Sequence, residues 1–211
     1  MFTYKNIQLQ WLGHAWFLIH YKDKKICIDP FKVQEDVKAE YIFITHKHRD
    51  HLSEIDLQKI ASLDTIIICP SSCEEALNEF PQKKIFLTSR DTLKLDGFAV
   101  QTIPAYNTDK FRSPGILYHA QDEWFVGFIF DFEWTRVYHA GDTDIIPEMK
   151  WMAPDIALLP IGGKYTMTPK EATEAAKLIA PQIVIPMHYG NGLSEDVDYL
   201  KAHAPCQVVL L

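Results

Sequence analysis

Residues 44–51 read ITHKHRDH and place three histidines and one aspartate within a single short segment. The segment follows the apolar run EYIFI, which is typical of a buried strand. Residues two apart in an extended chain point the same way, so we expect His46 and His48 to face one point beyond the strand end. Asp50 and His51 follow where the chain turns towards a helix, and they can serve a second point nearby. This pattern favours a metal site over a polar loop of hydrogen-bonded histidines.

Two later segments offer further metal ligands. Asp142 lies in YHAGDTD and His188 in PMHYG, and each follows a strand-like run. The carboxyl ends of strands are where α/β proteins place their sites. Taken alone, an aspartate in a Gly-Asp turn or a single histidine is more often structural. Together with the histidine segment, they predict two divalent ions about 3.5–4 Å apart, a known hydrolytic arrangement. Imidazole and carboxylate ligands favour Zn²⁺ and also suit Mn²⁺ or Fe²⁺.

The order of predicted elements indicates an α/β fold. Each half of the chain runs from a β meander into alternating strands and helices, which predicts a four-layer αββα sandwich of two mixed β-sheets flanked by helices. Thr168, Pro169 and Glu171 give the clearest helix start, a capping box with proline in the first turn. Strands are predicted at 7–12, 15–20, 25–29, 40–45, 65–69, 84–87, 92–95, 98–103, 115–120, 123–131, 135–142, 155–160, 182–187 and 207–211. Helices are predicted at 53–61, 71–80, 144–152, 168–180 and 194–204, and a long loop at 104–115.

Composition limits the kinds of partner. The 211 residues, 47% of them hydrophobic, can bury a sizeable core, which predicts a single domain over residues 1–211, built as one unit or two tightly joined halves. The net charge of −7 disfavours long nucleic acids and leaves a small-molecule substrate as the expected partner. We expect no membrane segment, because no run of 18 apolar residues occurs. The absence of a signal peptide and of a C-x-x-C pair favours the cytoplasm. The oligomeric state stays open.

The motifs THKHRDH, HAGDTD and PMHYG, in this order and at these separations, resemble the metallo-β-lactamase superfamily. The likeness is greatest to its small stand-alone metal-dependent hydrolases, the branch with the ascorbate-phosphate lactonase-like and N-acyl-phosphatidylethanolamine phospholipase-like enzymes. WLGHAWFLI, CIDPF and LLPIGGKYTMTPKEA extend it over essentially the whole chain. The resemblance implies a metallo-β-lactamase-like fold and a metal-dependent hydrolase, without specifying the substrate.

The resemblance also implies a role for each ligand. The first ion would be held by His46 and His48, and the second by Asp50, His51 and His188. Asp142 would bridge both ions together with a water or hydroxide. Asp50 and Asp142 are therefore the expected catalytic residues, and Asp50 is also a candidate for proton transfer.

One position departs from the family pattern. The third histidine of the first ion is expected in the loop between the halves, where this chain reads IPAYN and Asn107 takes its place. An amide oxygen is a poor zinc ligand, although harder ions accept it. His119 is a substitute if the loop folds back. Three alternatives stay open: Asn107 is a ligand, His119 is a ligand, or neither is.

Several other polar residues have two interpretations. Asp29 in CIDPF either orients the metal shell or simply ends a strand before proline. His14 and His139 are interpreted as core residues or as supports for the ligands. Lys164 in GGKYT either meets an anionic substrate group or lies in a simple turn.

The predicted function is a metal-dependent hydrolase that uses a metal-bound hydroxide to cleave an ester, lactone or phosphodiester bond of a small substrate, with a weak indication that the substrate is anionic. One alternative is an iron-dependent redox protein on the same scaffold. Another is a non-catalytic metal-binding protein, suggested by the missing third histidine.

Overall fold

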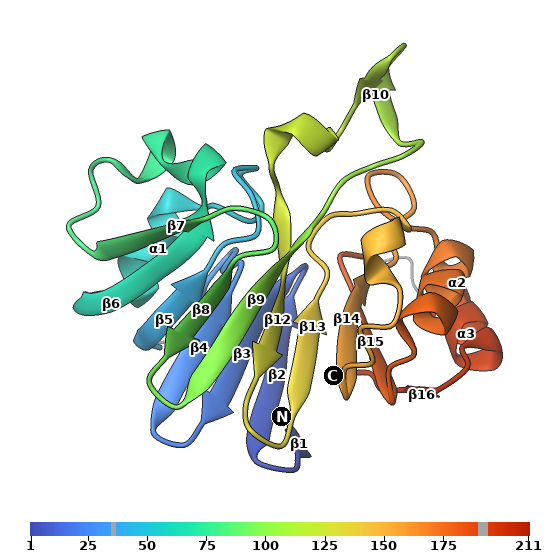
Figure 1. Cartoon of the computed structure of the whole chain (residues 1–211), viewed down its shortest axis with the longest axis horizontal. Helices are drawn as coiled ribbons and strands as arrows, with labels where there is room; N and C mark the ends of the chain where they lie inside the picture. The colour runs from blue at the N-terminus through green and yellow to red at the C-terminus, as the bar shows by residue number, and fades with distance from the viewer. Residues whose placement is uncertain (35–36, 190–193) are drawn as a thin grey trace. The chain divides into compact units, whose positions relative to one another are not determined.

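The computed structural model describes residues 1–34, 37–189 and 194–211 of the chain. The chain divides into two compact units, Met1–Thr88 and Ser89–Leu211. Each unit contains one seven-stranded sheet of mixed strand direction (Figure 1). The predicted α/β class with two mixed sheets is therefore confirmed, whereas the single domain over residues 1–211 stays a prediction.

The first unit begins with an antiparallel meander and continues with parallel strands. Its parallel part needs crossover connections, and helix α1 (Glu54–Ile60) provides the one between β5 and β6. Leu57 and Ile60 of α1 pack in one buried cluster with Leu18, Cys27 and other side chains of the sheet. The strands are β1 (Phe2–Tyr4), β2 (Ile7–Gly13), β3 (Trp16–Tyr21), β4 (Lys24–Ile28), β5 (Ala39–Phe43), β6 (Ala61–Pro70) and β7 (Lys83–Leu87).

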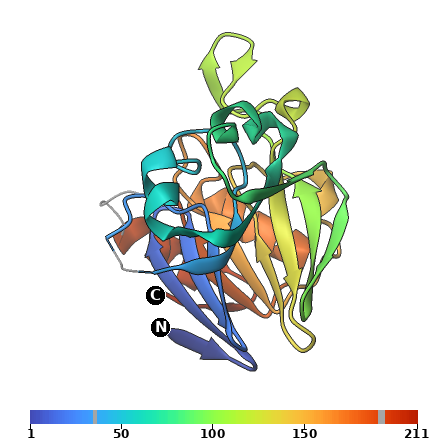
Figure 2. The same ribbon diagram turned by 90° about the vertical axis from the view of Figure 1, so that its left-hand side faces the viewer.

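The second unit repeats this plan with its own sheet. Helices α2 (Pro169–Ile179) and α3 (Ser194–His203) connect its parallel strands. The sheet strands are β8 (Thr92–Leu95), β9 (Phe98–Pro104), β12 (Val126–Asp131), β13 (Arg136–His139), β14 (Ile156–Pro160), β15 (Ile183–Met187) and β16 (Gln207–Val208). A separate hairpin of β10 (Phe111–Ser113) and β11 (Ile116–Leu117) extends beyond the end of this sheet (Figures 1 and 2).

The helix predicted at 168–180 is confirmed with its capping box. The backbone N of Thr168 donates to Glu171 Oε2 at 2.7 Å, and the backbone N of Glu171 donates to Thr168 Oγ1 at 3.2 Å. Among the helices of the described ranges, none is both long and apolar enough to cross a bilayer.

Five other predicted elements were wrong in type or length. Residues 71–80 form two 3₁₀ turns, η1 (Ser71–Cys73) and η2 (Glu75–Leu77), because their backbone N–H groups bond three residues back, as from Glu74 N to Ser71 O and from Leu77 N to Glu74 O. The predicted loop at 104–115 contains β10, and its partner β11 is all that remains of the strand predicted at 115–120. The last strand shortens to Gln207–Val208, and the helix predicted at 144–152 is only the 3₁₀ turn η4 (Pro147–Met149). A fourth turn, η3 (Gln121–Glu123), was not predicted, and Gly190 of the PMHYG motif lies outside the described residues.

Asp56 in α1 connects the helix to the segment after β4. Its carboxylate accepts from the backbone N of Lys32 at 2.8 Å and of Val33 at 3.0 Å. The Ser53 hydroxyl and the Lys59 ammonium donate to it at 2.7 and 3.0 Å. Burial raises the pKa of Asp56, but these hydrogen bonds outweigh burial and lower the pKa below its ordinary value. The charged form is therefore the one that stabilises the fold.

We expect Asp56→Asn to lower the free energy of unfolding by about 1–3 kcal/mol at pH 7. A carboxyl whose folded pKa is lowered stabilises the protein above its unfolded pKa, about 3.9, and this contribution disappears as the pH falls through the folded value. Urea unfolding between pH 7 and pH 3 should show the gap between wild type and variant closing at the acidic end. The exposed Asp64→Asn is the matched control. A gap that widens on acidification would contradict the assignment.

Candidate metal centre

The histidine segment of the first unit forms a tight turn between β5 and α1. The backbone N atoms of His51 and Leu52 both donate to His48 O, at 2.9 and 2.8 Å. The ring centroids of His46 and His51 lie 4.0 Å apart, and those of His46 and His48 lie 4.8 Å apart. His46 and His51 are buried, whereas His48 and Asp50 are half-buried. The turn therefore brings together the four ligands predicted from this segment.

A buried carboxylate orients two of these histidines. Asp29 Oδ1 accepts from the backbone N of Thr45 at 2.8 Å, and its Oδ2 accepts from Thr45 Oγ1 at 2.7 Å and from His51 Nδ1 at 2.8 Å. Because the Thr45 hydroxyl gives its proton to Asp29, its oxygen accepts from His46 Nδ1, 3.0 Å away. Both rings therefore carry a proton on Nδ1 and present the lone pair of Nε2. Of the two interpretations of Asp29, the structure supports orientation.

His14 also belongs to this cluster. The sequence interpretation did not include His14 among the candidate ligands. Its Nε2 lies 3.0 Å from Asp50 Oδ2. His14, Asp50 and His51 offer ligand atoms that all lie within 4.8 Å of one another. His14 sits in the tight turn between β2 and β3 with a positive φ of 54°, after Gly13 at φ 113°. The Gly-His turn between two strands was the available sequence signal.

The second unit gathers three further donors. Asp142 follows β13 and is 3% exposed. Its Oδ2 lies 3.0 Å from His188 Nε2 and 3.3 Å from His119 Nε2. His188 follows β15, and His119 follows β11, so residues nearly seventy positions apart in the chain meet at one carboxylate. Asp142 and His188 are thus neighbours, as the sequence predicted.

Asn107 is placed behind His119. Its Oδ1 accepts from the backbone N of His119 at 2.9 Å and lies 2.9 Å from His119 Nδ1. Its Nδ2 donates to the backbone O of Tyr165 at 3.0 Å, which fixes the orientation of the amide. An amide oxygen only accepts, so His119 Nδ1 carries a proton, and in the neutral imidazole Nε2 then presents its lone pair towards Asp142.

An ionic cluster around the buried Asp144 holds the segment that carries Asn107. Asp144 Oδ2 accepts from the backbone N of Thr108 at 2.7 Å and of Asp109 at 3.2 Å. Burial raises the pKa of Asp144. Lys110 Nζ lies 3.6 Å from Asp144 Oδ1 and 2.9 Å from Glu171 Oε1, at the start of α2. Burial lowers the pKa of Lys110, but its contacts with Asp109 and Glu171 raise that pKa by more. The net pKa is above its ordinary value, so Lys110 keeps its positive charge.

His139 has a supporting position in the same unit. It is fully buried, and its Nδ1 accepts from the backbone N of Gly141 at 3.2 Å. This bond shapes the turn that leads to Asp142, in agreement with the interpretation of His139 as a core or supporting residue.

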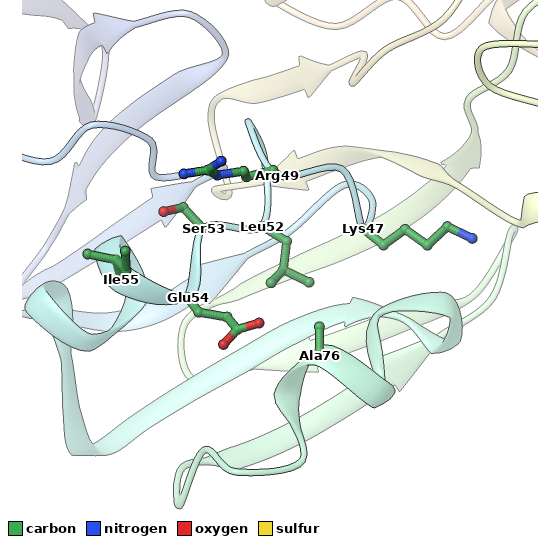
Figure 3. Close-up of a pocket in the computed structure, with 7 residues that line it drawn as sticks. All are labelled: Lys47, Arg49, Leu52, Ser53, Glu54, Ile55 and Ala76. Carbon is green, nitrogen blue, oxygen red and sulfur yellow. The ribbon is translucent and has the colours of Figure 1, made fainter.

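A hollow of about 350 Å³ lies on the first unit beside the histidine turn (Figure 3). Lys47 and Arg49 line it, but Figure 3 shows their side chains extending in opposite directions. Two diverging cations do not converge on one anion. The donors capable of holding a metal are those of the histidine turn and not those of this hollow.

Comparison with known proteins agrees with these motifs. A family described as "Beta-lactamase superfamily domain" matches residues 8–188. An Archaeoglobus fulgidus protein named UPF0173 metal-dependent hydrolase is 36% identical over 199 residues, covering 88% of this chain and 84% of the relative.

Solved structures agree with the fold. A Parabacteroides distasonis protein proposed to be a metal-dependent hydrolase superimposes with a TM-score of 0.83 at 33% identity, covering 97% of this chain and 92% of that one. Igni18, a metallo hydrolase from Ignicoccus hospitalis, superimposes with a TM-score of 0.77 at 26% identity, covering 97% and 94%. The expected metallo-β-lactamase-like fold class is thereby confirmed. The chain belongs to the metallo-β-lactamase superfamily, among its metal-dependent hydrolases.

Proposed function

We propose that the two units act as one metallo-β-lactamase-like domain, which binds two divalent metal ions and hydrolyses an ester, lactone or phosphodiester bond of a small substrate. The ions are proposed to be Zn²⁺, with Mn²⁺ or Fe²⁺ as substitutes, and the location to be the cytoplasm. Family membership supports the reaction class. The ligand sets within each unit support metal binding, and the proposal combines them into one centre.

The observation that carries this proposal is the pairing of His119 with Asp142. With its proton on Nδ1, His119 directs a lone pair at a carboxylate oxygen 3.3 Å away. Two electron-pair donors at this distance repel unless a positive charge lies between them. A divalent cation bound by both removes the repulsion. His46 and His51 likewise present Nε2, because Thr45 and Asp29 hold their Nδ1 atoms.

The same geometry leads us to assign the third histidine of the first ion to His119. Asn107 was the predicted ligand, but its oxygen already accepts two hydrogen bonds from His119 and its nitrogen donates to Tyr165. Imidazole nitrogen is also the better donor for zinc. We therefore propose the ligands His46, His48 and His119 for the first ion, Asp50, His51 and His188 for the second, and Asp142 for both.

The protein's own groups then have defined tasks. When bound, divalent cations act as Lewis acids and make water nucleophilic near neutral pH. The water oxygen adds to the carbonyl or phosphorus centre as the bond to the leaving oxygen breaks. Asp50 Oδ2 is half-buried and accepts the proton that the water loses, and it passes this proton to the leaving oxygen. His14, 3.0 Å from the same oxygen, keeps it in position.

Replacing a proposed ligand should abolish hydrolysis. His48→Ala and Asp142→Ala should each lower kcat/KM by more than the roughly 10–100-fold typical of residues that only support a ligand. The assay uses bis-p-nitrophenyl phosphate, p-nitrophenyl esters and simple lactones with added Zn²⁺ or Mn²⁺. His203→Ala, on the exposed side of α3, should retain activity.

Metal analysis after anaerobic purification separates the alternatives. Bound iron with a visible absorption band and no hydrolysis would favour the redox protein. Bound metal without turnover of any of these substrates would favour the non-catalytic protein. Either result would contradict the proposed hydrolase.

Asp29→Asn should weaken Zn²⁺ binding by about 10–100-fold, because it removes the negative charge that holds the proton of His51 on Nδ1. Competition with a chromogenic chelator measures this affinity. Thermal unfolding of both proteins in EDTA reports any loss of stability that does not depend on metal. Unchanged affinity in a folded Asn variant would show that Asp29 does not orient the ligand.

His119 and Asn107 can be told apart by counting ions. His119→Ala should bind one ion fewer per chain than the wild type, because a ligand is lost. Asn107→Ala should keep the wild-type number of ions at roughly 10–100-fold lower affinity, because only an orienting contact is lost. Elemental analysis after dialysis against buffered Zn²⁺ gives both numbers. The reverse pattern would identify Asn107 as the ligand.

A further inference from the structure

We propose that Tyr118, Tyr165 and Lys164 form a recognition surface for a substrate in which a planar aryl group adjoins a negative charge. This inference rests on the proposed function and narrows its substrate class. Among the ester, lactone and phosphodiester bonds considered above, it selects an aryl phosphodiester. These three residues are hereafter the tyrosine–lysine surface.

The loop that carries Lys164 and Tyr165 lies directly against a proposed metal ligand. A Cβ added to Gly162 would lie 2.5 Å from His188 O and 3.4 Å from His188 Nδ1, so only glycine permits this approach. Gly163 has a φ of 75°, and its backbone N donates to Met167 O at 3.0 Å. The backbone N of Lys164 donates to Gly162 O at 2.9 Å. The loop is thus a tight turn, closed by its own hydrogen bonds, that lies close against His188.

The other end of the loop is joined to the second ligand of the unit. Tyr165 O accepts from Asn107 Nδ2, and Asn107 in turn holds His119. Tyr118 immediately precedes His119, and its ring meets that of Tyr165 with centroids 4.7 Å apart and planes at 84°. Tyr118 is therefore the chain neighbour of His119, and Tyr165 is hydrogen-bonded to Asn107, which orients His119. A substrate bound at His119 is proposed to place its aryl group against these rings.

The surface is open and carries a positive charge. Tyr165 is 39% exposed, and Lys164 is exposed with its Nζ 4.9 Å from the centre of the Tyr165 ring. Within residues 1–34, 37–189 and 194–211, no carboxylate forms an ion pair with Lys164. An incoming anion can therefore contact this ammonium without displacing another partner. An aryl group beside that anion can pack against the exposed tyrosine ring.

Other cations near the candidate centre are less suited to this role. Lys110 is already bound by the carboxylates of Asp109, Asp144 and Glu171. Lys47 and Arg49 extend in opposite directions on the first unit (Figure 3). A chain with 28 acidic and 21 basic residues repels anions on average. A lysine without a carboxylate partner beside two tyrosines is therefore the feature that can attract a negatively charged substrate.

The kinetic test separates charge recognition from ring recognition. Lys164→Met should raise KM for bis-p-nitrophenyl phosphate about 2- to 5-fold, as expected for an exposed charge contact, and leave KM for the neutral p-nitrophenyl acetate unchanged. Tyr165→Leu should raise KM for both aryl substrates roughly 2- to 10-fold, and Tyr165→Phe should not. In each case kcat should change little, because these groups bind substrate and do not react. Lys170→Met, an exposed lysine in the first turn of α2, is the matched control.

A binding experiment distinguishes failure of this inference from failure of the proposed function. Titration of the EDTA-treated protein with phenylphosphonate, followed by NMR, reports on the tyrosine–lysine surface without any turnover. Wild type should bind phenylphosphonate more tightly than methylphosphonate, and Lys164→Met and Tyr165→Leu should each reduce this preference. If hydrolysis occurs but the variants change neither KM nor phosphonate binding, the inference is overturned and the hydrolase stands. If phosphonate binding depends on both residues but no substrate is hydrolysed, the surface stands and the hydrolase is overturned.

Discussion

The buried carboxylate of Asp29 is the constraint on which the candidate metal ligands of the first unit depend. It lies at the end of β4 in a left-handed conformation, with φ at 47°, and its side chain is completely buried. A buried charge is costly unless hydrogen bonds compensate it, and Thr45 and His51 supply them. Those same bonds fix which nitrogen of His46 and His51 carries the proton. One carboxylate therefore connects the ends of β4 and β5 and sets the chemistry of two imidazoles.

In the second unit, an amide and not a carboxylate orients a histidine. Asn107 orients His119 as Asp29 orients His51, by accepting a hydrogen bond at Nδ1. The two supports differ in charge, and an uncharged acceptor polarises the imidazole less than a carboxylate does. The Lys110 cluster then holds the segment that bears Asn107 to the start of α2. Lys110 and Asn107 are thus both engaged in contacts within the unit, Lys110 with carboxylates and Asn107 with His119.

Prediction from sequence succeeded where a local pattern was sufficient. Alternating and continuous apolar runs located the sheet strands other than β1, which was not predicted. The capping box located α2, because side-chain periodicity and end-capping are local properties. Prediction from sequence failed for residues 71–80, where α-helix and 3₁₀ turn share the same residue preferences. It also failed for residues 104–115, where a hairpin strand forms without a strong alternating pattern. His14 was interpreted as a core residue or a support and not as a ligand, because its Gly-His turn has no fixed spacing to the other candidate ligands.

The sequence by itself determined the family, the α/β class and the ligand candidates of three motifs, since fixed spacing after a strand dictates which side chains share a direction. Only the tertiary structure decided between Asn107 and His119 as the group facing Asp142. That choice depends on which atom of a side chain points at a distant carboxylate, and chain spacing does not encode the direction of a loop that folds back. The contact of Gly162 with His188 is of the same kind, because a close approach between two loops exists only once both strands that carry them are paired in the sheet.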